Sequence, residues 1–98
     1  MWILRTIGRP NESTFRLLSD STKTIGRATG ADFIIDEALV SRVHCRVQVN
    51  LSDDLDLTDL GSTNGLFVNG TRITTARLVP GDRIKVGRVE LIALKGAE

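Results

Sequence analysis

The sequence has 98 residues, 41% of them hydrophobic, with 13 basic and 12 acidic side chains and a formal net charge of +1. A chain of this length supports one compact core, so we expect a single domain spanning residues 1–98. The near balance of charge disfavours direct nucleic-acid binding, and no apolar run approaches the roughly 20 residues that cross a bilayer.

Short apolar runs separated by turn residues dominate the chain, and no run of ten or more residues keeps a helical period. The predicted strands, in chain order, are 2–7, 14–19, 23–27, 32–36, 43–49, 55–60, 66–68, 77–79, 82–87 and 89–95. About ten strands in 98 residues predict an all-β sandwich or barrel.

One of these segments and one of the turns between them carry distinct local signals. Residues 43–49 alternate most clearly, which places Val43, Cys45, Val47 and Val49 on one face and His44, Arg46 and Gln48 on the other. The dipeptide Asn69-Gly70 is typical of a two-residue hairpin turn.

Function in a β-sandwich usually lies on the loops, and three loops here carry unusual residues. Gly26-Arg27 stands at a strand end, Ser41-Arg42 leads into the alternating strand, and Ser62-Thr63-Asn64-Gly65 joins two strands. The chain also has ten arginines and only three lysines. Because the planar guanidinium matches phosphate and carboxylate with two bonds at once, this usage leans weakly toward an anion-binding site, although codon bias or ordinary surface chemistry explains the count better on its own.

In their order and spacing, Gly26-Arg27, Ser41-Arg42-Val43-His44, Ser62-Thr63-Asn64-Gly65 and Gly81-Asp82 resemble the motif of the forkhead-associated (FHA) domain. The resemblance covers residues 2–95. It implies a β-sandwich of about eleven mostly antiparallel strands in two sheets, with binding loops at one end. It also implies a function: recruiting a partner protein by binding a segment that contains phosphothreonine.

The resemblance assigns roles to individual residues. The phosphothreonine-binding residues are Arg27, Ser41, Arg42, Thr63 and Asn64. Arg27 is expected to supply the cation, Ser41 its hydroxyl and backbone N–H, and Asn64 an amide for the ligand backbone. The competing interpretations are an ion pair of Arg27 with Asp32, a freely solvated Arg42, and an Asx turn at Asn64.

The resemblance also assigns specificity and support. Leu39 lies two residues before the motif serine, where the family reads the third residue after the phosphothreonine, so an aliphatic preference is expected. The residues expected to support the site structurally are Gly26, His44, Gly65 and Asn69.

The adjacent His44 and Cys45 raise the alternatives of a hydrolase or a metal site. A hydrolase needs an acid and an oxyanion site beside Ser41 and His44, and zinc needs about four ligands, whereas the chain has one histidine and one cysteine. We therefore expect no enzyme activity, no metal and no cofactor. The remaining alternative is a phosphate-independent assembly module or homodimer, in which the apolar segments "MWILRTI" and "VELIALK" form an edge that can pair or pack.

The lone cysteine and the lack of a signal peptide are consistent with an intracellular protein. By family analogy we expect the amino-terminal domain of a larger signalling protein. Its location is expected to be nuclear, in the DNA-damage response, or cytoplasmic if the protein is bacterial.

Overall fold

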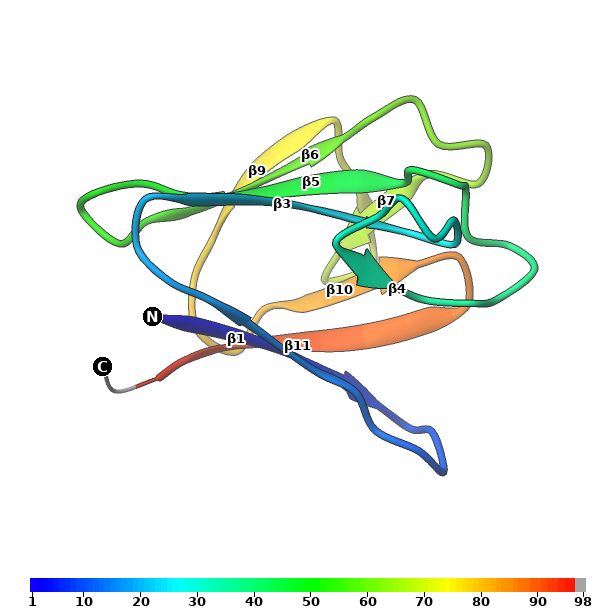
Figure 1. Cartoon of the computed structure of the whole chain (residues 1–98), viewed down its shortest axis with the longest axis horizontal. Coiled ribbons are helices and arrows are strands. Elements are labelled where there is room, and N and C mark those ends of the chain that lie inside the picture. The colour runs from blue at the N-terminus through cyan, green and yellow to red at the C-terminus, as the bar shows by residue number, and fades with distance from the viewer. Residues whose placement is uncertain (97–98) are drawn as a thin grey trace.

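A computed structural model describes residues 1–96, and those residues form strands, turns and loops but no helix, so none that could cross a membrane. The strands are β1 (Trp2–Ile7), β2 (Thr14–Leu17), β3 (Ser21–Gly26), β4 (Phe33–Ile34), β5 (Cys45–Val49), β6 (Leu55–Asp59), β7 (Leu66–Val68), β8 (Thr71–Arg72), β9 (Thr75–Leu78), β10 (Arg83–Val86) and β11 (Val89–Lys95). They form two facing layers (Figure 1). The expected eleven-stranded, two-sheet β-sandwich is confirmed.

The first sheet has six strands in the order β2-β1-β11-β10-β7-β8, and the second has five in the order β4-β3-β5-β6-β9. Every strand pair is antiparallel except β3 with β4. The pairing of β1 with β11 runs from Trp2 opposite Lys95 to Ile7 opposite Glu90, and β1 also pairs with β2. Both terminal strands therefore lie inside the sheet, and the expectation that they form a pairable edge is wrong.

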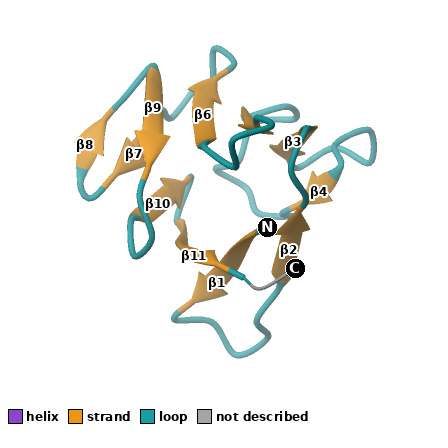
Figure 2. Ribbon diagram, turned by 90° about the vertical axis from the view of Figure 1, so that its left-hand side faces the viewer, coloured by secondary structure: helices purple, strands orange, loops and turns teal. Residues whose placement is uncertain are grey.

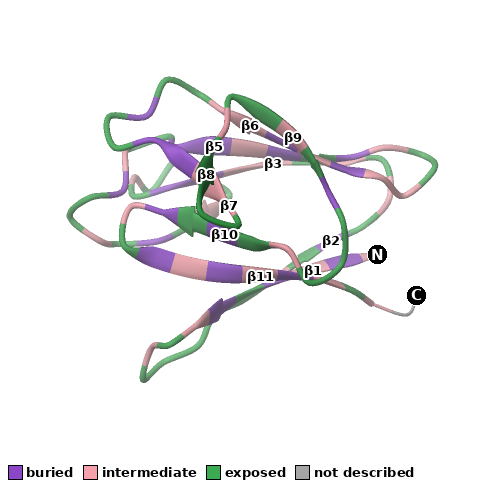
Figure 3. Cartoon of the chain, turned by 180° about the vertical axis from the view of Figure 1, so that it is seen from behind, coloured by how far each residue is buried: buried purple, intermediate pink, exposed green. Residues whose placement is uncertain are grey.

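Alternating apolar residues build the core between the sheets. Along β11 every second residue is buried, and Figure 3 shows that alternation as bands along the strand. Trp2 is 2% exposed and its indole N–H donates to the backbone carbonyl of Asp53 over 2.8 Å, so this side chain belongs to the core. Within residues 1–96, eighteen buried apolar side chains join one continuous cluster, which leaves the loops free to carry polar groups.

The alternating segment begins two residues later than the sequence predicts. The strand starts at Cys45, where Cys45, Val47 and Val49 point into the core as expected. Val43 is 44% exposed and His44 is fully buried, the reverse of the predicted facing. The reason is that both residues still belong to the preceding loop, where the two-residue strand period does not apply.

The Asn69-Gly70 turn forms the predicted hairpin. It leads into strand β8, which the sequence analysis missed. Val68 of β7 pairs with Thr71 of β8, and Asn69 and Gly70 have φ values of 50° and 83°. Two positive φ values define the type I′ turn that Asn-Gly favours. Strand β8 has only two residues, both exposed, so it has no apolar alternation to reveal it; Figure 2 shows it beside β7 at one edge of the molecule.

Asp53, in the loop between β5 and β6, joins the chain's first and last strands. Its carboxylate accepts hydrogen bonds from the N-terminal amine (3.2 Å), the Ser19 hydroxyl (3.1 Å) and the Lys95 ammonium. The Lys95 bond, together with those from the amine and Ser19, lowers the pKa of Asp53 to about 2 against an ordinary value of 3.8. The charged form of Asp53 is therefore stabilised by folding.

Replacing Asp53 with asparagine should lower the melting temperature at pH 7, because it removes the charge that these donors stabilise. A carboxylate whose pKa is depressed in the folded state contributes stability above pH 3.8 and loses it as pH falls towards 2. The difference between wild type and Asp53→Asn, measured by thermal unfolding from pH 7 to pH 2, should shrink across that window. Asp20→Asn is the matched control, since Asp20 and Asp53 both have a positive φ (59° and 63°) and Asp20 is exposed. A difference between wild type and Asp53→Asn that stays constant with pH would contradict the assignment.

Candidate functional site

Three loops converge at one end of the sandwich: those joining β3 to β4, β4 to β5, and β6 to β7 (Figure 1). They enclose an open pocket of about 290 Å³. Its lining residues are Arg27, Ala38, Leu39, Val40, Ser41, Arg42, Thr63 and Asn64. The structure thus brings together all five predicted binding residues and the predicted specificity residue Leu39.

Arg27 is fixed to the neighbouring loop through its stem. Its backbone N–H donates to the Ser41 carbonyl (3.0 Å) and its Nε–H donates to the Val40 carbonyl (3.1 Å). Among residues 1–96, its two terminal guanidinium nitrogens have no hydrogen-bond partner, and the side chain is exposed. The pocket therefore contains an oriented cation with free donors.

The alternative ion pair of Arg27 with Asp32 does not form. Asp32 accepts hydrogen bonds from the backbone N–H (2.8 Å) and hydroxyl (3.2 Å) of Thr24. The Thr24 backbone bond is the main reason that the pKa of Asp32 is lowered. Asp32, the carboxylate nearest in sequence to Arg27, therefore has hydrogen-bond donors of its own and does not pair with Arg27.

Gly26 allows two loops to approach closely. A Cβ at this position would lie 2.0 Å from the carbonyl oxygen of Arg42, a backbone atom that cannot swing aside. The contact is reinforced by the bond from the Ala28 N–H to the same carbonyl (3.1 Å). Only glycine lets the Arg27 loop and the Ser41 loop lie at this separation.

The structure differs from the prediction for Ser41 in the role of its backbone N–H, which was expected to bind the ligand. Its backbone N–H donates to Nδ1 of His44 (3.0 Å), so this group is already used and cannot serve a ligand. Its hydroxyl oxygen accepts from the Thr63 N–H (3.1 Å), which leaves the hydroxyl proton free to donate. Among residues 1–96 the backbone N–H of Arg42 has no partner, so the free backbone donor lies one residue further along.

Thr63 and Asn64 form the opposite side of the pocket. One Asn64 amide N–H donates to the Leu39 carbonyl (2.9 Å), which ties this loop to the specificity residue. The second amide N–H and the Oδ1 oxygen remain as one donor and one acceptor. The amide therefore bridges two loops rather than closing a local Asx turn.

The side chain of His44 links the loop that contains Ser41 to the loop that contains Gly65. Its ring is fully buried, Nδ1 accepts from the Ser41 N–H, and Nε2 lies 2.8 Å from the Gly65 carbonyl. Because Nδ1 is an acceptor, the proton is on Nε2, which donates to Gly65. Its backbone N–H also donates to the Ile25 carbonyl (2.8 Å), and its carbonyl accepts from the Leu60 N–H (3.1 Å).

Gly65 has a φ of +87°, a conformation that favours glycine, and its N–H donates to the Ser62 hydroxyl (3.1 Å).

Asn69, by contrast, lies at the other end of β7, away from the pocket. Its side chain bonds to Asp82 (2.9 Å) and to the Arg83 N–H (2.9 Å). Its contacts support the turn before β10 rather than the site, because the three residues of β7 separate it from Gly65.

Cys45 is packed into the core beside His44. Burial, with a smaller effect of Asp59, raises the pKa of its thiol to about 12, so the sulfur is a neutral core atom at physiological pH. Within residues 1–96, no three His, Cys, Asp or Glu side chains gather as a metal site would require.

The sequence analysis missed two lining residues, Ala38 and Val40. Val40 contributes the carbonyl that orients Arg27, and its side chain is buried in the core. Nothing in the residue types of this pair signals a binding role, and the contribution of Val40 is made by a backbone atom.

Replacing His44 with alanine should destabilise the fold by about 2–4 kcal/mol, since it leaves a cavity and removes the partner of the buried Gly65 carbonyl and of the part-buried Ser41 N–H. Urea unfolding at pH 7 measures this loss. Arg42→Ala is the control, because that side chain is exposed and should change stability by less than about 0.5 kcal/mol. Equal stability of His44→Ala and wild type would show that the imidazole does not brace the loops.

Comparison with known proteins gives a family for this geometry. The family model described as "FHA domain" matches residues 23–87. The oxoglutarate dehydrogenase inhibitor of Corynebacterium efficiens is 34% identical over 87 residues, which are 89% of this chain and 61% of that protein, so the chain spans less than two thirds of that relative.

Solved structures give the same family. The FHA domain of the CT664 protein from Chlamydia trachomatis superposes with a TM-score of 0.92, covers 98% of each chain and, at 24% identity, shares the fold. A structure from an analysis of phosphothreonine-dependent FHA domain interactions has a TM-score of 0.84 and 28% identity, over 99% of this chain and 98% of that one.

Proposed function

This chain belongs to the FHA domain family, and from that premise we propose that it binds a phosphothreonine-containing segment of a partner protein and so recruits that partner. The observation that carries the proposal is the set of free donors that surrounds one pocket. The structure compared above is named for phosphothreonine-dependent FHA domain interactions, which supports the same ligand here.

The chemistry of phosphothreonine matches these donors. Its phosphate carries about −1.5 to −2 charge and three strong acceptor oxygens. We assign the terminal nitrogens of Arg27 to the charge, and the hydroxyls of Ser41 and Thr63 with the backbone N–H of Arg42 to the remaining oxygen lone pairs. The exposed Arg42 guanidinium adds a second cation at the rim.

Asn64 is assigned to the ligand backbone, because its free amide N–H and Oδ1 can pair with one carbonyl and one N–H of an extended peptide. Leu39 is 37% exposed at the edge of the pocket. We propose that its apolar side chain favours an aliphatic residue three positions after the phosphothreonine, where a cation would favour an acid.

The biological setting follows the bacterial relative. That relative is named an inhibitor of oxoglutarate dehydrogenase, which is a regulatory role, so we propose a bacterial regulator or adaptor without catalytic turnover. A bacterial source favours the cytoplasmic alternative over the nucleus. The DNA-damage role gains no support from this relative.

Arg27→Ala should weaken binding of a phosphothreonine peptide by about 30-fold or more, because it removes the fixed cation, while the loss of its bond to the Val40 carbonyl should lower the free energy of unfolding by less than about 1.5 kcal/mol. Fluorescence anisotropy with a labelled peptide measures the affinity. Arg46→Ala is the matched control, since Arg46 lies on the outer face of the five-stranded sheet. Equal binding of the phosphorylated and unphosphorylated peptides to wild type would refute the proposal.

Phosphoserine should bind more weakly than phosphothreonine by about one to two orders of magnitude. Burying the threonine methyl contributes about 0.8 kcal/mol, and the empty space left by serine adds a further cost. Calorimetric titration with two peptides that differ only by this methyl group tests the expectation. Indistinguishable affinities would show that the loops form no methyl pocket.

A further inference from the structure

The outer face of the six-stranded sheet combines cations with apolar side chains in a regular register. Strand pairing sets Arg16 beside Ile3, Arg5 and Arg83 on either side of Ile92, and Lys85 between Glu90 and Phe67. Arg72 of β8 follows next to Phe67. We call this surface the basic sheet face; its residues are Ile3, Arg5, Ile7, Arg16, Phe67, Arg72, Arg83, Lys85, Glu90, Ile92 and Leu94.

The basic sheet face is much more positively charged than the chain as a whole. Its strands present five cations and one carboxylate, although the net charge of the protein is only +1. Glu90 pairs with Arg83 over 3.3 Å. Within residues 1–96, Arg72 and Lys85 belong to no ion pair, so the face attracts carboxylates.

The apolar residues of the face indicate what kind of anion it accepts. Ile3, Ile7, Phe67, Ile92 and Leu94 are all half-buried, so each leaves part of its apolar surface open to solvent. A simple anion would gain nothing from that surface. A polypeptide that carries both carboxylates and apolar side chains would satisfy both halves of the pattern.

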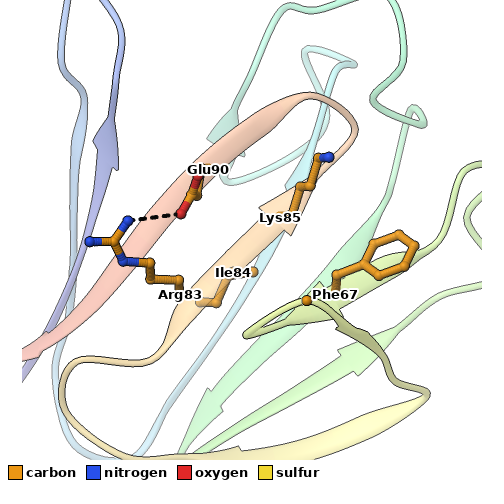
Figure 4. A pocket seen from close by; sticks show the side chains of 6 residues that line it. Phe67, Arg83, Ile84, Lys85 and Glu90 are labelled. Atoms are coloured by element: carbon orange, nitrogen blue, oxygen red, sulfur yellow. Dashed lines mark hydrogen bonds and ion pairs between the residues drawn. The ribbon is translucent and has the colours of Figure 1, made fainter.

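One hollow on the face has the size of a side-chain pocket. It measures about 330 Å³ and is lined by Phe67, Gly70, Arg83, Ile84, Lys85 and Glu90. In Figure 4 the Phe67 ring lies on one side of the hollow, and Lys85, Arg83 and Glu90 extend from β10 and β11 on the other. An apolar side chain seated there would have cations at the rim for its acidic neighbours.

The basic sheet face is continuous with the loop pocket through Arg72. The Arg72 guanidinium lies against Gly65, where a Cβ would be only 2.8 Å from Nε. Gly65 directly follows Asn64, which lines the pocket. Phe67 follows Asn64 by three residues, and Lys85 pairs with Phe67 on the neighbouring strand. Because an extended chain advances about 3.3 Å per residue, a ligand segment of similar length is enough to extend from the pocket to this pair.

We propose that the basic sheet face binds an acidic segment, with interspersed apolar residues, that flanks the phosphothreonine in the same partner protein. This inference rests on the proposed function and adds a second contact surface to it. Charge complementarity selects the acidic character, and the continuity at Gly65 and Arg72 selects a segment of the same ligand. The loop pocket would then recognise the phosphate, while the sheet face would discriminate among phosphorylated partners.

The test uses a short phosphothreonine peptide with neutral flanks and versions of it extended on either side by glutamates and a leucine. In matched controls, glutamine replaces every glutamate. In low salt, the acidic extension on one side should raise affinity about tenfold over its glutamine control, and added salt should reduce this gain. The double variant Arg72→Gln and Lys85→Gln should lose the gain and keep the affinity for the short peptide.

Arg46→Gln, on the opposite face of the sandwich, should keep the gain. In ¹⁵N spectra the acidic extension should shift the amides of β7, β8 and β10. A gain that survives in the Arg72 and Lys85 double variant, or no gain with either extension, would overturn the proposal, as would binding to anionic lipid vesicles in place of the peptide. Failure of the short peptide itself to bind would instead refute phosphothreonine recognition, and this extension with it.

Discussion

The binding end of this protein depends on the buried imidazole of His44. One ring nitrogen accepts the N–H of Ser41 and the other donates to the carbonyl of Gly65, so a single neutral side chain joins two loops. Backbone groups that lack partners away from water are costly, and the residue that pairs with the part-buried Ser41 N–H and the buried Gly65 carbonyl thereby fixes the separation of the loops. The Ser41 hydroxyl and the Thr63 N–H meet at 3.1 Å as a consequence.

Close backbone packing completes what the imidazole begins. The Arg42 carbonyl lies where a side chain at Gly26 would stand, and the backbone of Leu39 lies 2.9 Å from the corresponding position at Gly87. These contacts hold the β4–β5 loop against both sheets, so its carbonyls can orient the Arg27 stem and the Asn64 amide. The cation enters the pocket already positioned, which reduces the entropy lost when an anion binds.

The two proposed contact surfaces have different physical characters. The loop pocket is small and polar, with donors aimed at one doubly charged group, whereas the basic sheet face is wide and carries dispersed charge among apolar side chains. Gly65 lies buried between the two, since it accepts from His44 on one side and packs against Arg72 on the other. Such a division gives phosphate dependence to one surface and partner discrimination to the other.

The sequence by itself determined the all-β class, nearly every strand and the Asn69-Gly70 hairpin, because turn residues and alternation are local signals. The resemblance of its spaced motifs to the FHA domain also gave six of the eight residues that line the loop pocket, but not Ala38 and Val40. Only the tertiary structure decided the rest. It turned His44 inward and Val43 outward, used the Ser41 N–H within the protein, and placed Asn69 away from the site. It also gathered the basic sheet face from strands far apart in the chain, because hydrogen-bond partners and strand register are settled by packing across the sandwich.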